Sequence, residues 1–150
     1  MSRFSKIALI FVLMQMSLTA SALDFRSVAV PKAILYDAPS VSAKKVLLLS
    51  QSYPVEVVVN LGDWLKVRDA QGAIHWVEAK QLSTKRSVMV IKSQAEMRAK
   101  PDAAADLVAT IDKDVVLELV EAKANQGWLK VKHRDGATGY ILVSSTWGFD

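Results

Sequence analysis

Apolar and polar side chains alternate in short segments along most of the chain, which is the period of β-strands rather than of helices. Val55, Val57 and Val59 share one face of an extended segment, and Leu65 and Val67 share one face of the next. No segment keeps a helical period long enough to bury a helix. The alanine-rich residues 102–109 follow a proline and are expected to form a loop or a single turn. The pattern therefore predicts an all-β protein.

Turn-forming residues separate these segments. Residues 60–63 and 69–72 each combine aspartate with glycine, and residues 134–136 contain an Asp-Gly pair. Asp-Gly between two alternating segments is a strong signal for a β-hairpin. We therefore expect the strands to follow one another as antiparallel hairpins.

The chain contains one unit twice. Asp63-Trp64-Leu65-Lys66-Val67 recurs as Gly127-Trp128-Leu129-Lys130-Val131, 64 residues later, and residues 55–58 match residues 117–120 at an offset of 62. Short strands in units of about 60 residues must close on themselves to avoid exposed edges. The expected architecture is therefore two tandem small β-barrels, at residues 23–84 and 85–150. The connection between them, residues 83–87, has no glycine or proline, so we expect a semi-fixed arrangement.

The first 22 residues are typical of a signal peptide. Arg3 and Lys6 precede an apolar run at residues 7–18, and Ala20-Ser21-Ala22 predicts cleavage between Ala22 and Leu23. The apolar run is shorter than the roughly 20 residues that span a bilayer. We therefore expect a periplasmic or secreted protein that is not an integral membrane protein after cleavage.

The composition excludes cysteine-based sites and argues against a nucleic-acid partner. There is no cysteine, which excludes disulfides, thiolate metal sites and a cysteine nucleophile. Lys and Arg number 19 against 15 Asp and Glu, and loss of Arg3 and Lys6 with the signal peptide would leave 17 against 15. Because this balance is close to neutral, no nucleic-acid partner is expected. We expect a monomer.

No catalytic constellation is present in the sequence. It has no G-x-S-x-G elbow, no H-E-x-x-H motif, no P-loop and no Rossmann glycine pattern. The two histidines, His75 and His133, occupy non-equivalent positions in different copies, which is typical of surface histidines rather than of metal ligands. We therefore expect no enzyme activity, no catalytic residue, no metal site and no cofactor.

The repeated segments resemble the bacterial SH3 (SH3b) domain family, in its tandem exported form. The resemblance rests on residues 54–58, 63–69 and 76–77 in the first copy and on residues 127–131 and 139–141 in the second. It implies barrels of five or six strands and a non-enzymatic role in binding peptides or cell-wall material. His75 stands where the family has a glycine before the closing Trp76.

Aromatic and basic residues are the candidate contacts. Trp64 and Trp128 alternate with core positions, so they lie on the face away from the inferred core. In the family this position borders a peptide-binding groove, and the alternative is that each tryptophan covers its own barrel or seals the contact between the barrels. The ligand-binding candidates are Tyr36, Tyr53, Trp64 and Trp76 in the first copy and Arg98, Trp128, Lys130 and Tyr140 in the second.

Three functions compete at this point. The first is a non-catalytic exported module that binds peptide, protein or peptidoglycan stems in the cell envelope. The second is a structural adaptor that docks on a single envelope partner protein, with the aromatic residues buried in that contact. The third, an unrecognised wall hydrolase, is disfavoured because nothing in the sequence singles out a catalytic pair.

Overall fold

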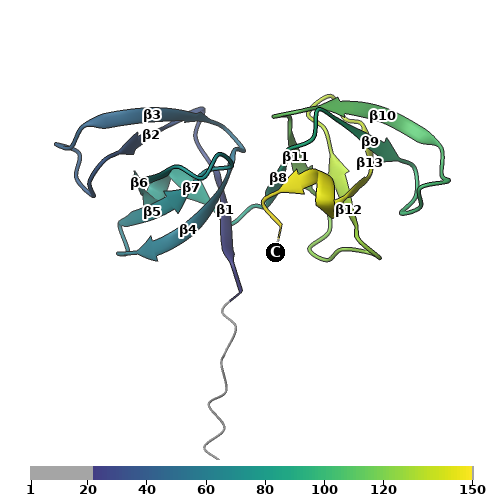
Figure 1. The fold of residues 1–150 in the computed structure, drawn as a ribbon. Helices are drawn as coiled ribbons and strands as arrows, with labels where there is room; N and C mark the ends of the chain where they lie inside the picture. Colours follow the sequence, from purple (N-terminus) through teal and green to yellow (C-terminus); the bar gives the residue numbers. More distant parts are fainter. Residues whose placement is uncertain (1–21, 150) are drawn as a thin grey trace, which may run out of the picture.

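The computed structural model describes residues 22–149, so the predicted signal peptide, apart from Ala22, lies outside the described residues. The described part is built from β-strands and two short 3-10 turns (Figure 1). The strands form two seven-stranded antiparallel sheets, one for each copy of the repeat, and each sheet curls around its own core. The prediction of an all-β chain with two tandem barrels is confirmed. Within residues 22–149, no helix is long and apolar enough to cross a membrane.

The two barrels have the same topology. In barrel 1 the strand order is β3-β2-β6-β5-β4-β1-β7, and in barrel 2 it is β10-β9-β13-β12-β11-β8-β14. The strands of barrel 1 are β1 (Asp24–Val28), β2 (Lys32–Tyr36), β3 (Lys45–Ser50), β4 (Pro54–Asn60), β5 (Trp64–Arg68), β6 (Ile74–Glu78) and β7 (Leu82–Ser83), with a 3-10 turn at Ala79–Gln81. The strands of barrel 2 are β8 (Ser87–Val90), β9 (Gln94–Arg98), β10 (Leu107–Asp112), β11 (Val116–Leu119), β12 (Trp128–Lys132), β13 (Thr138–Leu142) and β14 (Thr146–Trp147), with a 3-10 turn at Val143–Ser145.

Each sheet has more strands than the five or six that the resemblance implied. The additional pairing comes from the ends of each copy, where β1 pairs with the two-residue β7 and β8 pairs with β14. The expected loop at residues 102–109 is also shorter than predicted. Residues 102–105 form the turn, and β10 begins at Leu107 because the following apolar residues pair with β9.

Apolar residues at every second position of β5 and β12 contribute to the two cores. Leu65 and Val67 are 0% and 1% exposed, and their counterparts Leu129 and Val131 are both fully buried. Val59 is a correction to the sequence prediction, because it is 39% exposed although Val55 on the same strand is fully buried. A bulge in the pairing of β4 with β5, between Val57 and Val59, inserts one residue and moves Val59 to the outer face.

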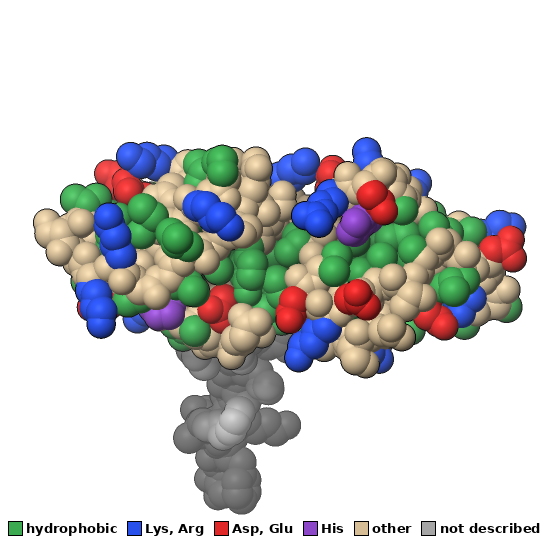
Figure 2. Space-filling model, turned by 90° about the horizontal axis from the view of Figure 1, so that it is seen from above, with side chains coloured by type: hydrophobic (Ala, Val, Ile, Leu, Met, Phe, Trp, Pro, Cys, Tyr) green, Lys and Arg blue, Asp and Glu red, His purple; other side chains and the backbone are tan. Residues whose placement is uncertain are grey.

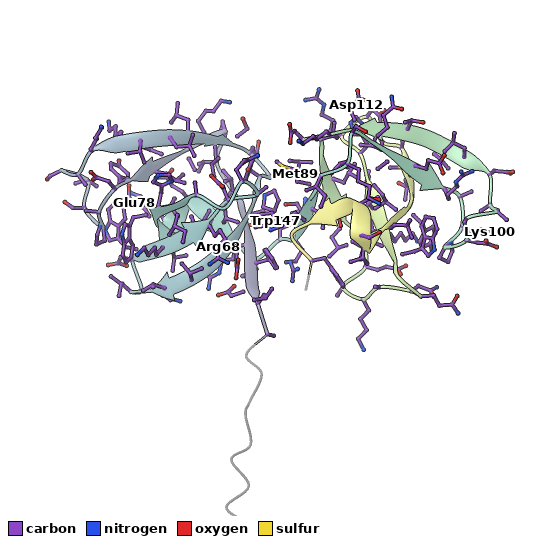
Figure 3. All side chains as sticks on the ribbon, viewed as in Figure 1. Arg68, Glu78, Met89, Lys100, Asp112 and Trp147 are labelled. Atoms are coloured by element: carbon purple, nitrogen blue, oxygen red, sulfur yellow. The ribbon has the colours of Figure 1, made fainter. Side chains whose placement is uncertain are left out.

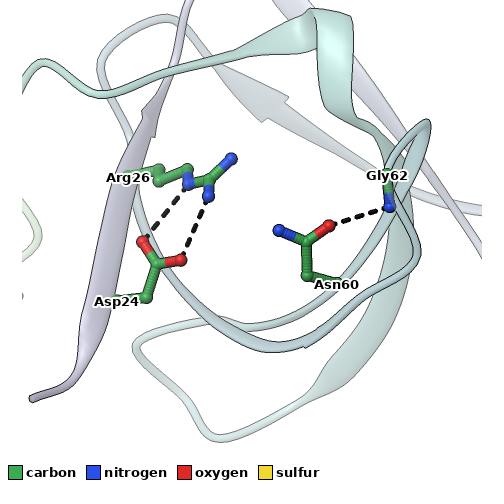
Figure 4. Close-up of polar contacts among 4 residues, drawn as sticks. All are labelled: Asp24, Arg26, Asn60 and Gly62. Carbon is green, nitrogen blue, oxygen red and sulfur yellow. Dashed lines mark hydrogen bonds and ion pairs between the residues drawn. The ribbon is translucent and has the colours of Figure 1, made fainter. Parts of the chain in front are cut away.

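The predicted turns are present and are held by side-chain hydrogen bonds. After β4, the Gly62 amide donates to Asn60 Oδ1 at 2.8 Å, and Gly62 has φ +88°, in the left-handed region (Figure 4). In the same view, Arg26 of β1 donates to Asp24 at 3.1 and 3.2 Å. After β5, Asp69 Oδ1 accepts from the backbone amides of Gln71 and Ala73, both at 3.0 Å. The hairpin predictions at these turns are confirmed.

The two barrels pack against each other directly. The ring of Trp147 in β14 meets Phe25 in β1 edge-to-face, with centroids 5.3 Å apart and planes at 88°. The guanidinium carbon of Arg86 lies 5.4 Å from the centre of the Phe25 ring, and Arg86 Nη2 donates to the Gly148 carbonyl at 2.8 Å. Phe25 is only 6% exposed as a result. Figure 3 shows Met89 and Trp147 at this junction, between the two barrels.

A second part of the junction involves the backbone. Ser87 Oγ donates to the Ser52 carbonyl of barrel 1 at 2.5 Å. At Gly148, an added Cβ would lie 2.9 Å from the Ser87 carbonyl oxygen and 3.2 Å from Pro54 Cβ, so only glycine permits this approach. The junction therefore depends on tight contacts from both barrels and from the connection between them.

Candidate functional site

A row of outward-facing side chains crosses three strands of barrel 1. Tyr36 of β2 is the Cα partner of Trp76 in β6, and Trp76 is the partner of Lys66 in β5. Lys66 Nζ lies 5.7 Å from the centre of the Trp76 ring, within the range of a cation–π contact. We call Tyr36, Trp76 and Lys66 the outer row of barrel 1. The structure thus brings together two of the predicted contact residues and adds Lys66, which the sequence interpretation did not select.

Trp64 lies beside this row. Its ring packs edge-to-face on Tyr36, with centroids 5.4 Å apart and planes at 81°. Tyr36 is 4% exposed, whereas Trp64 and Trp76 are half-buried. Such a pair is worth about 0.5–1.5 kcal/mol beyond its buried area. Trp64 therefore covers Tyr36 while part of its own surface stays accessible.

Barrel 2 carries a basic version of the same arrangement. Arg98 of β9 is the Cα partner of Tyr140 in β13, and Tyr140 is the partner of Lys130 in β12. We call Arg98, Tyr140 and Lys130 the outer row of barrel 2. All three side chains are half-buried. The two rows occupy equivalent places on the two sheets, so the repeat positions the candidates identically while their chemistry differs.

The basic side chains of the barrel 2 row are already engaged. Arg98 donates to the Ala105 carbonyl at 3.1 Å and pairs with Glu96, and Lys130 lies 3.4 Å from Glu121. Trp128, at 9% exposure, lies opposite Leu142 on β13 and is more deeply buried than Trp64. Tyr140, which is half-buried, therefore offers more accessible aromatic surface than Trp128.

Tyr53 is not part of either row. It packs against the core of barrel 1, and its hydroxyl donates to Gln71 Oε1 at 3.0 Å. Burial raises the pKa of this phenol, and the nearby carboxylates of Asp69 and Asp114 raise it further. Asp114 belongs to barrel 2, so Tyr53 lies on the side of barrel 1 that faces its neighbour.

His75 and Gly139 mark a difference in how the two barrels are packed. They occupy equivalent places in β6 and β13. An added Cβ on Gly139 would lie 2.5 Å from Met97 Cγ and 2.8 Å from the Arg98 carbonyl oxygen, so barrel 2 requires glycine there. Barrel 1 accommodates a half-buried His75, whose Nδ1 is buried and has no hydrogen-bond partner within residues 22–149.

A cleft between the barrels was not anticipated from the sequence. It has a volume of about 550 Å³ and is bounded by the turn before β4, the connection before β8, the turn before β11 and the hairpin after β12. The lining residues are Ser27, Ser50, Gln51, Ser52, Lys85, Arg86, Ser87, Asp114, Val115, Val116, Glu118, Lys132, His133 and Arg134. The basic runs at 85–86 and 132–134 are visible in the sequence. The pairing of β11 with both β8 and β12 brings these runs together, and the docking of barrel 1 adds the opposite wall of the cleft.

No group of three or more His, Asp or Glu side chains within residues 22–149 is arranged to hold a metal ion. The shifted pKa values belong to Tyr53 and to Asp135, whose pKa is lowered by the Ala137 amide and by His133. The main cause is burial for Tyr53 and a backbone hydrogen bond for Asp135, and neither group lies in an outer row.

Comparison with known proteins gives a consistent family assignment. The family model described as "Bacterial SH3 domain" matches residues 29–84 and again residues 92–148. No curated protein sequence matches the chain.

Solved structures give only distant likenesses. NlpC2 from Trichomonas vaginalis is 14% identical, with a TM-score of 0.38 over 84% of this chain and 48% of that one. An NlpC/P60 family protein from Bacillus cereus ATCC 10987 is 17% identical, with a TM-score of 0.38 over 82% of this chain and 55% of that one. The chain spans about half the length of these proteins.

Proposed function

Because the chain belongs to the bacterial SH3 domain family in both of its halves, we propose that it is a non-catalytic exported binding protein of the cell envelope. Its ligands are peptides or the peptide stems of peptidoglycan. Bacterial SH3 domains are generally binding modules. The observation that carries the proposal is the outer row of barrel 1, where the Lys66 ammonium lies over the ring of the half-buried Trp76.

The chemistry of the rows fits an extended peptide. Aromatic rings supply rigid apolar contact area, and the cation beside Trp76 suits a carboxylate on the ligand. Because Tyr36 is buried beneath Trp64, we assign it the role of supporting Trp64, with Trp64, Trp76 and Lys66 as the contacts. In barrel 2, Tyr140 takes the place of Trp76 and Lys130 that of Lys66. We expect weaker contact with the ligand there, because the ring is smaller and Lys130 is already paired with Glu121.

Co-sedimentation with purified sacculi tests the proposal. The test variant combines Trp76→Ala with Tyr140→Ala. The matched control combines Ile74→Ala with Thr138→Ala, which are exposed residues on the same strands and the same faces, two positions away. We expect the test variant to lose at least tenfold in retention and the control to keep it. Equal retention of both variants, or no retention of the unmodified protein, refutes the proposal.

An adaptor role is the second candidate, and one observation favours it. Val46, Leu47 and Leu48 on the edge strand β3 are 37%, 36% and 59% exposed. Leu107 and Val108 on the equivalent edge strand β10 are 50% and 43% exposed, and Figure 2 shows hydrophobic side chains on both barrels from above. If the chain is an adaptor, one partner protein should co-purify with it stoichiometrically, and Leu48→Lys should abolish this co-purification. The chain itself should then show no affinity for sacculi.

A further inference from the structure

We propose that the cleft between the barrels is a second binding site, separate from the outer rows, for a short peptide that carries two or more carboxylates. The proposal does not depend on the outer rows. It rests on the shape of the cleft, on the charge of its walls and on the contacts that fix the two barrels around it.

The cleft has the size of a small-ligand site. Its volume of about 550 Å³ falls within the range of roughly 300–1,000 Å³ that ligand pockets occupy. Barrel 1 contributes the turn at residues 50–52, and barrel 2 contributes the turn at residues 114–116 and the hairpin at 132–134. Ligand pockets occur preferentially at interfaces between domains.

The walls carry a surplus of positive charge. Four permanent cations line the cleft, Lys85, Arg86, Lys132 and Arg134, against two carboxylates, Asp114 and Glu118. An anionic ligand is therefore favoured over a neutral or cationic one.

Two of these cations have structural partners and two are available. Lys85 pairs with Glu118 at 3.5 Å, and Arg86 is committed to the Gly148 carbonyl and the Phe25 ring. Lys132 and Arg134 are exposed, and neither takes part in an ion pair within residues 22–149. Lys132 and Arg134 are therefore the groups that we expect to hold carboxylates by charge-assisted hydrogen bonds.

The opposite wall suits the amide groups of a peptide. Ser50, Gln51 and Ser52 of barrel 1 line the cleft and carry neutral hydroxyl and amide groups. Ser50 Oγ accepts from Lys32, and Gln51 Nε2 donates to the Ala29 carbonyl. Ser52 has φ +71° at the turn, and its carbonyl accepts from Ser87, which ties this wall to the connection between the barrels. One wall therefore offers cations and the other neutral donors and acceptors. Such a pair of walls fits a ligand with carboxylates at one end and peptide groups along its length.

The site is formed before the ligand arrives. The contacts of Phe25 with Trp147 and of Ser87 with Ser52 fix the separation of the two walls. A preformed site avoids the entropy cost of ordering two barrels on binding. It follows that a ligand in the cleft also stabilises the docked arrangement of the barrels, because it binds only when both walls are in place.

The test uses N-acetyl-Glu-Glu, which has three carboxylates, and the same dipeptide with every carboxyl converted to an amide. Binding is followed by amide resonance shifts of the whole protein at low and at physiological salt. We expect the carboxylate form to shift residues 50–52, 85–87, 114–116 and 132–134, with weaker affinity at higher salt. The neutral form and inorganic phosphate should bind at least tenfold more weakly, because one lacks the charge and the other cannot reach both walls.

Two variants act in opposite directions. Lys132→Gln combined with Arg134→Gln should lower the affinity for the carboxylate dipeptide at least tenfold. The control, Lys92→Gln with Lys123→Gln, removes the same charge from exposed positions of barrel 2 that do not line the cleft and should leave affinity within twofold. Asp114→Asn removes a repelling carboxylate, keeps a side chain that tolerates φ +69°, and should tighten binding severalfold.

The proposal is overturned if the amidated dipeptide or phosphate binds as well as the carboxylate form, or if the shifts lie outside the cleft. It is also overturned if the Lys132 and Arg134 variant binds as tightly as its control. The Trp76 and Tyr140 variant should bind the dipeptide normally. Failure of the outer rows and failure of the cleft are therefore distinguishable.

Discussion

The contact between Phe25 and Trp147 joins residues of two different barrels, so its loss measures how strongly the barrels are docked. The two rings meet edge-to-face at 5.3 Å. Such a pair contributes about 0.5–1.5 kcal/mol beyond its buried area. Trp147→Leu alone should cost more than this, about 1–3 kcal/mol, because it also exposes Phe25, which is 6% exposed in the intact protein.

A double-mutant cycle isolates the contact itself. Phe25→Leu, Trp147→Leu and the double variant are unfolded by urea, and the interaction energy is the departure of the double variant from additivity. We expect about 0.5–1.5 kcal/mol of coupling. The contact of Arg86 with Phe25 is lost in both legs that change Phe25, so it cancels from the cycle.

The control cycle pairs Phe25→Leu with Tyr140→Leu, a residue of barrel 2 on the outer row. These two changes should be additive within roughly 0.5 kcal/mol. If the interaction energy between Phe25 and Trp147 is no larger than that of the control cycle, the contact does not contribute as predicted. In that case the barrels are not held together by their aromatic contact, and the preformed cleft loses its basis.

Three further predictions concern single positions. Gly139→Ala should destabilise the protein by about 1–3 kcal/mol in thermal unfolding, because its Cβ would overlap Met97 Cγ at 2.5 Å and the Arg98 carbonyl at 2.8 Å; unchanged stability contradicts the packing. The folded-state pKa of Asp135 is lowered, so its stabilising effect is present above the unfolded pKa and is lost as pH falls through the folded value. The difference in free energy of unfolding between the unmodified protein and Asp135→Asn should therefore disappear in acid. A difference that is independent of pH contradicts this role of Asp135. The folded-state pKa of Tyr53 is raised, so its contribution is present below the unfolded pKa near 10 and is lost as pH rises through the folded value. Absorbance of the phenolate should show a tyrosine that titrates late, and this step should disappear in Tyr53→Phe.

The alternation of apolar residues correctly predicted the core positions of β5 and β12. Leu65 and Leu129 are buried where the strand period places them, and the repeat placed equivalent side chains in equivalent strands. Val59 shows the limit of that reasoning. A bulge inserts one residue into the pairing of β4 with β5, and no feature of the valine-rich segment reveals where the strand changes face.

The candidate site was predictable only within one barrel. Tyr36 and Trp76 meet because hairpin register is local, and the same register aligns Arg98 with Tyr140. Tyr53 was grouped with them because it is aromatic, although it packs against the core of barrel 1 and its hydroxyl donates to Gln71. The cleft could not be predicted, because it depends on how Trp147 packs against Phe25 across more than 100 residues of chain.

In the proposed function, the outer rows bind peptide stems and leave them intact. The most direct measurement is an amide-resonance titration of the protein with a purified soluble disaccharide-peptide fragment of the cell wall, followed by the mass of the fragment recovered. We expect saturable shifts of the amide resonances of Lys66, Trp76, Lys130 and Tyr140, and a recovered fragment of unchanged mass. A cleaved fragment, or a row that shows no saturable shifts, contradicts the proposed function.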